Sequence, residues 1–172
     1  MLKTVTPRAA LAASLILTAL LASPVYSHCQ IPCGIYDDPA RFKLLAEHIT
    51  TMEKSMKQIN ELSKAEKPDY NQITRWVMNK ESHADELSEI VTYYFMTERL
   101  KPTDPSDAQA YRKYIKELTL CHQLLVNAMK AKQTTDLAYI AKLRKDLAQF
   151  KQSYLGEHDH DHDHDHGHGH KH

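Results

Sequence analysis

Four segments of the chain repeat apolar side chains every three or four residues, and a proline or an aspartate marks each break between them. This spacing places each set on one face of an α-helix. The four sets are Leu45, Ile49, Met52, Met56 and Ile59; Ile73, Val77, Ala84, Leu87, Val91 and Tyr94; Tyr111, Tyr114, Leu118, Cys121, Leu125 and Ala128; and Leu137, Ile140, Leu143, Leu147, Phe150 and Tyr154. Short connections between such helices predict an all-α fold, an antiparallel four-helix bundle over residues 37–155.

Capping residues and prolines predict where these helices begin and end. We expect the first helix over about 39–66, with Asp38 as N-cap and Pro39 in its first turn. The second helix should be capped by Asp69 or Asn71 and should end near Leu100. The third should start at Asp104 and Pro105, and the fourth should be capped by Thr134–Asp136. No alternating run or Asn-Gly turn competes with this pattern, and only four glycines are present. Helix is therefore favoured over sheet.

Residues 1–27 have the pattern of a cleaved secretory signal peptide. Lys3 and Arg8 precede an apolar run of about 14 residues, and Val25-Tyr26-Ser27 provides small or modest side chains at a cleavage site. The run is shorter than the roughly 20 residues of a membrane-spanning helix. We expect an exported protein, periplasmic or secreted, with no stable membrane anchor after cleavage. A cut after Ser23 is also possible, but only a cut after Ser27 frees the amine of His28.

The balance of charge argues against nucleic acid as a partner. The chain has 22 basic and 22 acidic residues, and loss of residues 1–27 would remove only Lys3 and Arg8, which leaves a net charge of −2. No basic face is implied.

Residues 28–36, here called the hook, have the sequence His28-Cys29-Gln30-Ile31-Pro32-Cys33-Gly34-Ile35-Tyr36. In an exported chain, Cys29 and Cys33 could form a disulfide or bind a metal, and the spacing favours neither. Two thiolates, the terminal amine and a deprotonated amide would form a plane that suits Ni(II) or Cu(II). The His28 ring could add an axial ligand. Zinc usually takes four side-chain ligands, and this segment offers three.

The motif His-Cys-x-x-Pro-Cys-Gly-x-Tyr resembles the nickel hook of nickel superoxide dismutases. The resemblance implies that His28, Cys29 and Cys33 bind one nickel ion per subunit. It implies catalytic roles for His28, whose ring binds in the oxidised state, and for Tyr36, which stands over the open face and orders substrate or water. Gln30 departs from the Asp of some members, at a position that is not a ligand.

A weaker similarity to this family extends to about residue 155, through residues 71–75, 80–84 and 138–141. It implies a dismutase that converts superoxide to O2 and H2O2 by Ni(III)/Ni(II) cycling. It also implies a homo-oligomer, a hexamer, in which neighbouring subunits enclose the hooks. One alternative is an exported nickel or copper carrier without turnover, and another is a structural bundle with a Cys29–Cys33 disulfide. Tyr36 favours the enzyme, because a carrier needs no residue over the open face.

Four side chains outside the hook are candidates either for contact with a metal ligand or for burial. Glu47 and His83 could hold the His28 ring, because ligand imidazoles need such partners. The simpler interpretation of His48 and His83 is a histidine at the surface or at the edge of the core. Cys121 lies on the apolar face of the third helix, which predicts a buried, unreactive thiol.

Residues 156–172 form a His-rich tail that we expect to be disordered. Its eight histidines, interleaved with Asp and Gly, would bind Ni, Zn, Cu or Co with little selectivity. An expression tag is the alternative, but a tag is normally an unbroken run of histidines. We expect the tail to capture metal close to the hook.

Overall fold

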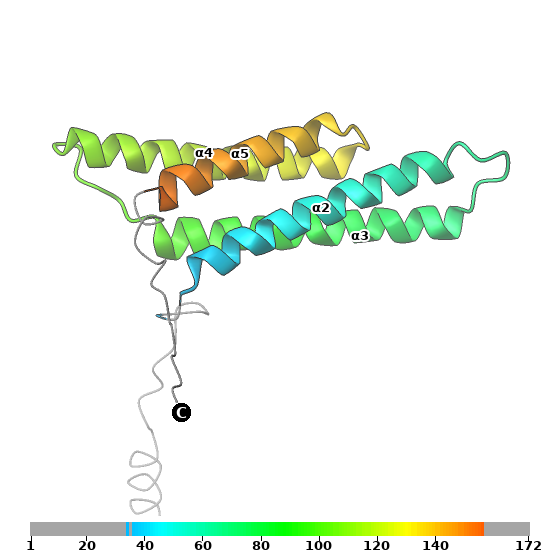
Figure 1. Cartoon of the computed structure of the whole chain (residues 1–172), viewed down its shortest axis with the longest axis horizontal. Coiled ribbons are helices and arrows are strands. Elements are labelled where there is room, and N and C mark those ends of the chain that lie inside the picture. The colour runs from blue at the N-terminus through cyan, green and yellow to red at the C-terminus, as the bar shows by residue number, and fades with distance from the viewer. Residues whose placement is uncertain (1–33, 35, 157–172) are drawn as a thin grey trace, which may run out of the picture. The chain divides into compact units, whose positions relative to one another are not determined.

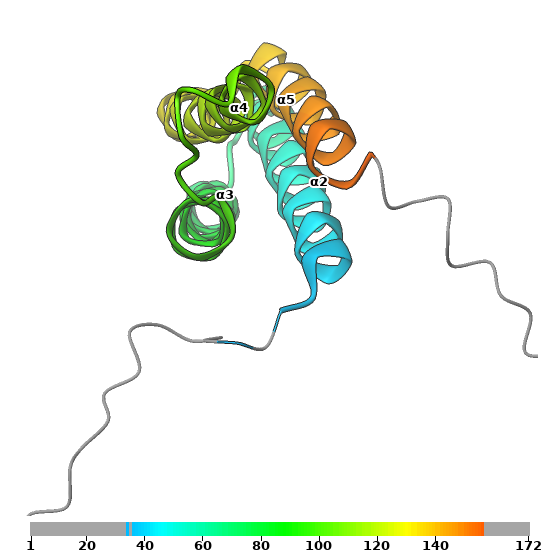
Figure 2. The same ribbon diagram turned by 90° about the vertical axis from the view of Figure 1, so that its left-hand side faces the viewer.

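The computed structural model describes residue 34 and residues 36–156. Its helices are α2 (Asp38–Leu62), α3 (Tyr70–Glu89), η1 (Ile90–Arg99), α4 (Ala108–Gln133) and α5 (Ala138–Leu155). Because η1 continues α3, these elements form four antiparallel rods, in which α2 packs on α3 and α4 packs on α5 (Figures 1 and 2). The predicted all-α four-helix bundle is confirmed. No strand occurs among the described residues, and none of the helices described is long and apolar enough to cross a membrane.

The start of α2 differs from the prediction by one residue. Asp37, not Asp38, is the N-cap, and its carboxylate accepts a hydrogen bond from the amide of Ala40 at 2.9 Å. Asp38 cannot do this because its carboxylate faces Arg99 and two tyrosines. The helix ends at Leu62, one turn earlier than expected.

Among the other helix starts, that of the second helix is confirmed, because Asp69 caps α3 and accepts from the amide of Gln72 at 3.1 Å. The N-cap of α5 is Leu137, one residue later than the predicted cap, although Asp136 accepts from the first amide of this helix at 2.9 Å. The third helix starts later than Asp104, because Asp107 is the cap of α4. Asp104 instead accepts from the amide of Ser106 at 2.8 Å, in a turn ahead of the helix.

Residues from all four rods form one apolar core. Its fully buried side chains include Leu45, Met52 and Met56 on α2, Leu87 on α3, Val91 and Phe95 on η1, Leu124 on α4, and Leu143 and Phe150 on α5. Cys121 belongs to this core as a free, buried thiol, as predicted.

The predicted apolar face of α3 is wrong in its first half. Val77 is 37% exposed, whereas Lys80 is buried with 3% exposure. The Lys80 ammonium donates to the carbonyl oxygens of Ala131, Lys132 and Thr134 at 2.9, 2.5 and 3.2 Å. These carbonyls lie at the C-terminal end of α4, where no helical amide remains to bond them. The Lys80 side chain therefore points into the bundle, where its ammonium group bonds carbonyl oxygens that no helical amide can reach.

The second rod changes from α-helix to π-helix at Ile90, where an α-helix to Leu100 was expected. The amide of Leu100 bonds to the carbonyl of Phe95 at 2.8 Å, and the Thr97 hydroxyl bonds to the carbonyl of Thr92 at 2.9 Å, both five residues apart. π-Helical stretches are rare and frequently lie at functional sites. Glu98, in the last turn of this one, is buried.

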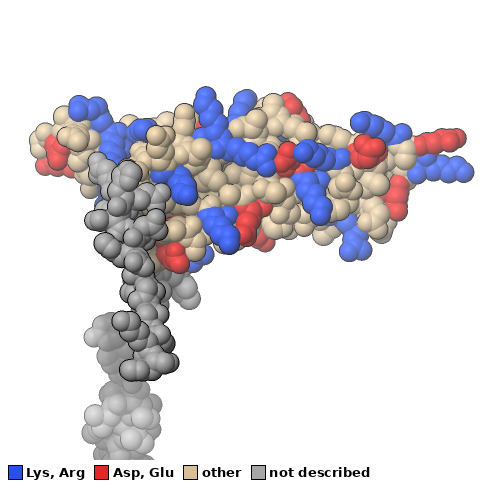
Figure 3. All heavy atoms as spheres, viewed as in Figure 1, with Lys and Arg blue, Asp and Glu red and all other residues tan. Residues whose placement is uncertain are grey.

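The surface carries both signs of charge. Figure 3 shows Lys and Arg side chains interspersed with Asp and Glu along the helices of this face. Glu53 illustrates the pattern, because its carboxylate pairs with Lys57 at 2.8 Å and with Arg144 at 2.6 Å.

Candidate metal centre

The backbone turns sharply just after the second expected thiolate ligand. Gly34 has φ = 79°, in the left-handed region that favours glycine, with open space where a Cβ would lie. His28, Cys29 and Cys33 lie outside the described residues. Their donor set of two thiols, an imidazole and an amine fits nickel.

The Tyr36 side chain is held by the end of η1. Its hydroxyl donates to Glu98 Oε2 at 2.6 Å. Its ring meets Tyr94 edge-on, with ring centroids 5.8 Å apart, and Arg99 Cζ lies 4.4 Å from its centroid. Tyr94, Glu98 and Arg99 of η1 thus orient the ring and the hydroxyl of Tyr36.

Asp38 joins three elements at this end of the bundle. Arg99 donates to both of its oxygens through Nε at 2.9 Å and Nη2 at 2.6 Å. The hydroxyls of Tyr94 and Tyr154 donate to the same carboxylate at 2.6 and 3.0 Å. The first turn of α2 is thereby tied to η1 and α5. A two-pronged Arg–carboxylate pair combines charge with fixed geometry.

The protonation states of this cluster are well defined at neutral pH. Burial acts to raise the pKa of Asp38, but hydrogen bonds from Arg99, Tyr94 and Tyr154 outweigh it and lower that pKa. Burial and the Asp38 charge raise the pKa of Tyr154 to about 12, and burial and the hydrogen bond to Asp38 raise that of Tyr94. Both tyrosines keep their protons while Asp38 is an anion and Arg99 a cation.

Glu98 is a buried carboxylate under the Tyr36 hydroxyl. It is 6% exposed, and its Oε1 accepts no hydrogen bond from the described residues. The sequence reasoning missed Glu98, Arg99 and Asp38. One signal was available, because Glu98 continues the stripe of Val91 and Tyr94 at helical spacing, and a charge on an apolar stripe marks a buried polar site.

Glu47 is exposed, and His83 lies in another cluster of side chains. His83 Nδ1 lies 2.8 Å from His48 Nδ1 and 3.6 Å from Glu86 Oε2. His48 is 5% exposed, and burial lowers its pKa. Since the His28 ring lies outside the described residues, a role of Glu47 and His83 in holding it stays a prediction.

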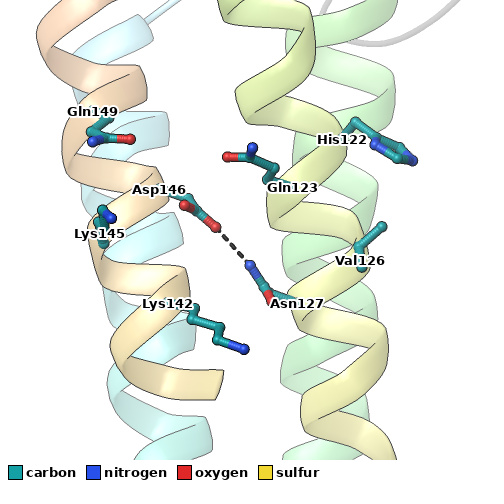
Figure 4. A pocket seen from close by; sticks show the side chains of 8 residues that line it. All are labelled: His122, Gln123, Val126, Asn127, Lys142, Lys145, Asp146 and Gln149. Atoms are coloured by element: carbon teal, nitrogen blue, oxygen red, sulfur yellow. Dashed lines mark hydrogen bonds between the residues drawn. The ribbon is translucent and has the colours of Figure 1, made fainter. Parts of the chain in front are cut away.

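A groove of about 540 Å³ lies between α4 and α5. Figure 4 shows Asp146 and Asn127 facing each other across it, joined by a 2.7 Å hydrogen bond, while His122 points away from them. It contains none of the expected site residues, so we do not assign it to the metal centre.

Comparison with protein families identifies one match. The model of the family described as nickel-containing superoxide dismutase matches residues 23–158, which include the hook and every described helix. Comparisons with curated proteins and with solved structures gave no match.

Proposed function

The chain belongs to the nickel-containing superoxide dismutase family, and we propose on this premise that His28, Cys29 and Cys33 hold its nickel. Its function is the disproportionation of superoxide, 2 O2⁻ + 2 H⁺ → O2 + H2O2, and its cofactor is nickel. The observation that supports the ligand assignment is that the family match runs through residues 28–36, where the two thiols and the histidine lie.

The proposed ligands suit a redox metal. Cys29 and Cys33 would provide thiolates, Cys29 its amide nitrogen, and His28 its amine and its ring. When bound, nickel supplies a Ni(III)/Ni(II) couple for one-electron exchange with superoxide. Thiolate and amidate donors stabilise the higher oxidation state, because they donate electron density strongly.

We propose that Tyr36 orients substrate or water without donating its own proton. Its hydroxyl donates to Glu98 Oε2, which engages its proton and fixes the direction of the O–H bond. The two protons of the reaction then come from solvent.

Substitution of the ligands tests the assignment. Cys29→Ser and Cys33→Ser should abolish superoxide removal and the Ni(III) electron-paramagnetic signal even where nickel stays bound, because the serine hydroxyl remains protonated. His28→Gln should keep nickel but lower turnover. Cys121→Ala is the matched control and should do neither. Dismutation at the wild-type rate by a nickel-loaded Cys29→Ser or Cys33→Ser protein would overturn the assignment.

We further propose export and cleavage after Ser27, which would make the His28 amine a ligand. N-terminal sequencing of the active protein should begin at His28. A fully active form that retains even one residue before His28 would contradict an amine ligand.

We propose assembly as a homohexamer, which the family resemblance implies and which exposed apolar side chains support. Tyr70 is 73% exposed, Met78 65% and Met129 45%. Light scattering coupled to size exclusion should give six subunits per particle. A monomer at micromolar concentration would exclude this assembly.

For the His-rich tail we propose capture of metal for the hook. Deletion of residues 157–172 should leave turnover per bound nickel unchanged and raise the external nickel needed for loading. Loss of activity in the fully loaded truncated protein would show that the tail belongs to the catalytic unit.

A further inference from the structure

Three metal-binding side chains converge between α2 and α3. His48 comes from α2, while His83 and Glu86 come from successive turns of α3. The two Nδ1 atoms lie 2.8 Å apart, and Glu86 Oε2 lies 3.3 Å from that of His48 and 3.6 Å from that of His83. Residues three apart share one helix face, and metal sites in helical bundles are built from such facing side chains.

These distances match one face of a metal tetrahedron. Zinc binds histidine nitrogen and carboxylate oxygen at about 2.0–2.2 Å, which places neighbouring ligand atoms about 3.3 Å apart. The three atoms here, 2.8, 3.3 and 3.6 Å apart, scatter around this value. A cation at their centre would require only small rotations of the side chains.

The three side chains differ in solvent exposure, so one side of the cluster is open to solvent and could admit a fourth ligand. The His48 side chain is 7% exposed, that of His83 27% and that of Glu86 53%. A metal held there would have the bundle on one side and solvent on the other. Two imidazoles, one carboxylate and a water form a familiar set of zinc ligands.

We propose that His48, His83 and Glu86 form a second metal site, which takes a zinc-like divalent cation and clamps α2 to α3. The site differs from the hook in its donors, because it has no thiolate. Imidazole and carboxylate at the corners of a tetrahedron suit Zn²⁺, whereas the thiolate-rich hook suits nickel. The alternative is that no metal binds here and the two histidines share a proton in a hydrogen bond between their Nδ1 atoms.

The thermal midpoint of the full-length, nickel-loaded protein distinguishes these two states. A ligand that binds only the folded chain raises the midpoint, whereas a ligand that binds the folded and the unfolded chain equally does not. Zinc bound to the eight tail histidines should therefore contribute little. For zinc at about 100 times its dissociation constant, the midpoint should rise by at least about 5 °C.

Variants inside and outside the proposed site test whether the zinc-dependent rise of the midpoint comes from these three residues. Glu86→Gln keeps the shape of an exposed side chain and should remove most of the zinc-dependent rise, and His83→Gln should remove nearly all of it. Glu89→Gln, on the same helix, and His122→Gln, an exposed histidine on α4, should retain the wild-type rise. Glu86→Gln should also keep the wild-type dismutation rate per nickel.

Anomalous diffraction at the zinc edge gives a second measurement that does not depend on stability. Zinc-soaked crystals should show a peak within about 2.2 Å of the three ligand atoms. An equal rise of the midpoint in Glu86→Gln and wild type, or no rise in either, would overturn the proposal, as would a zinc peak confined to other residues. Each of these results would leave a hydrogen-bonded histidine pair.

Discussion

The Tyr36 hydroxyl donates to Glu98 Oε2 at 2.6 Å, although the two residues are 62 positions apart in the chain. Tyr36 is the last residue of the hook, and Glu98 lies in the last turn of η1. This bond sets the direction of the one hydroxyl that the family resemblance places over the metal. It also gives the mechanism a residue that the motif does not contain.

Loss of this bond should lower turnover without loss of nickel. Glu98→Gln keeps the size of the side chain but removes the charge that orients the Tyr36 hydroxyl, and Tyr36→Phe removes the hydroxyl itself. We expect each to reduce the dismutation rate per nickel by about tenfold, or about 1.4 kcal/mol. Stopped-flow measurement of superoxide decay, with nickel content determined in parallel, checks this.

The double variant makes the test specific. If both residues act through one bond, Tyr36→Phe with Glu98→Gln should be no slower than the slower single variant. Glu117→Gln, a second buried carboxylate whose partner is Ser153, is the control and should keep wild-type turnover. Additive losses would mean that Glu98 does not act through Tyr36.

The Asp38 cluster should make stability depend on acid pH. The folded pKa of Asp38 is lowered, so its contribution is complete above the unfolded value of about 3.9 and is lost as pH falls through the folded pKa. Asp38→Asn should cost about 1–3 kcal/mol in the free energy of unfolding at pH 7 and less at pH 3. Urea unfolding between pH 3 and pH 7 measures both quantities.

Asp85→Asn is the matched control for Asp38. Asp85 pairs with Lys132 at 2.6 Å, but its side chain is 59% exposed, so removal should cost at most about 1 kcal/mol. Equal losses for the two aspartates would show that the links from Asp38 to η1 and α5 add nothing to stability.

Replacement of Lys80 should lower the free energy of unfolding more than replacement of an exposed lysine. Lys80→Met keeps most of the apolar stem but leaves the carbonyls of Ala131, Lys132 and Thr134 without this donor. We expect a loss of about 2–5 kcal/mol in the free energy of unfolding. Lys151→Met, at an exposed position of α5, should change it by less than about 0.5 kcal/mol. Similar values for both would contradict a capping role.

Cys121 should be inert in the folded protein. Burial first, and the nearby Glu117 second, raise the pKa of its thiol to about 12, so almost no thiolate exists at pH 8. Mass spectrometry after treatment with iodoacetamide should find Cys121 alkylated only when urea is present. Cys121→Ala should cost about 1–3 kcal/mol in stability. Alkylation of the native protein at Cys121 would contradict its burial.

The sequence by itself determined the four helices, their order and the class of metal chemistry. Apolar spacing, Asp69, Asp136 and the prolines are local signals, because the bonds they control span only a few residues. The hook motif is local in the same sense, since all its proposed ligands lie within six residues. The burial of Cys121 followed from its place on an apolar stripe.

Only the tertiary structure decided which polar residues meet. Glu98 follows Val91 and Tyr94 at helical spacing, but only the packing of the end of η1 beside the start of α2 brings Glu98 to Tyr36 and Arg99 to Asp38. Lys80 is buried because the end of α4 arrives beside it with unpaired carbonyls. His48 meets His83 because α2 and α3 pack at one relative rotation. These pairings depend on helix rotation and packing between distant segments, which local patterns do not encode.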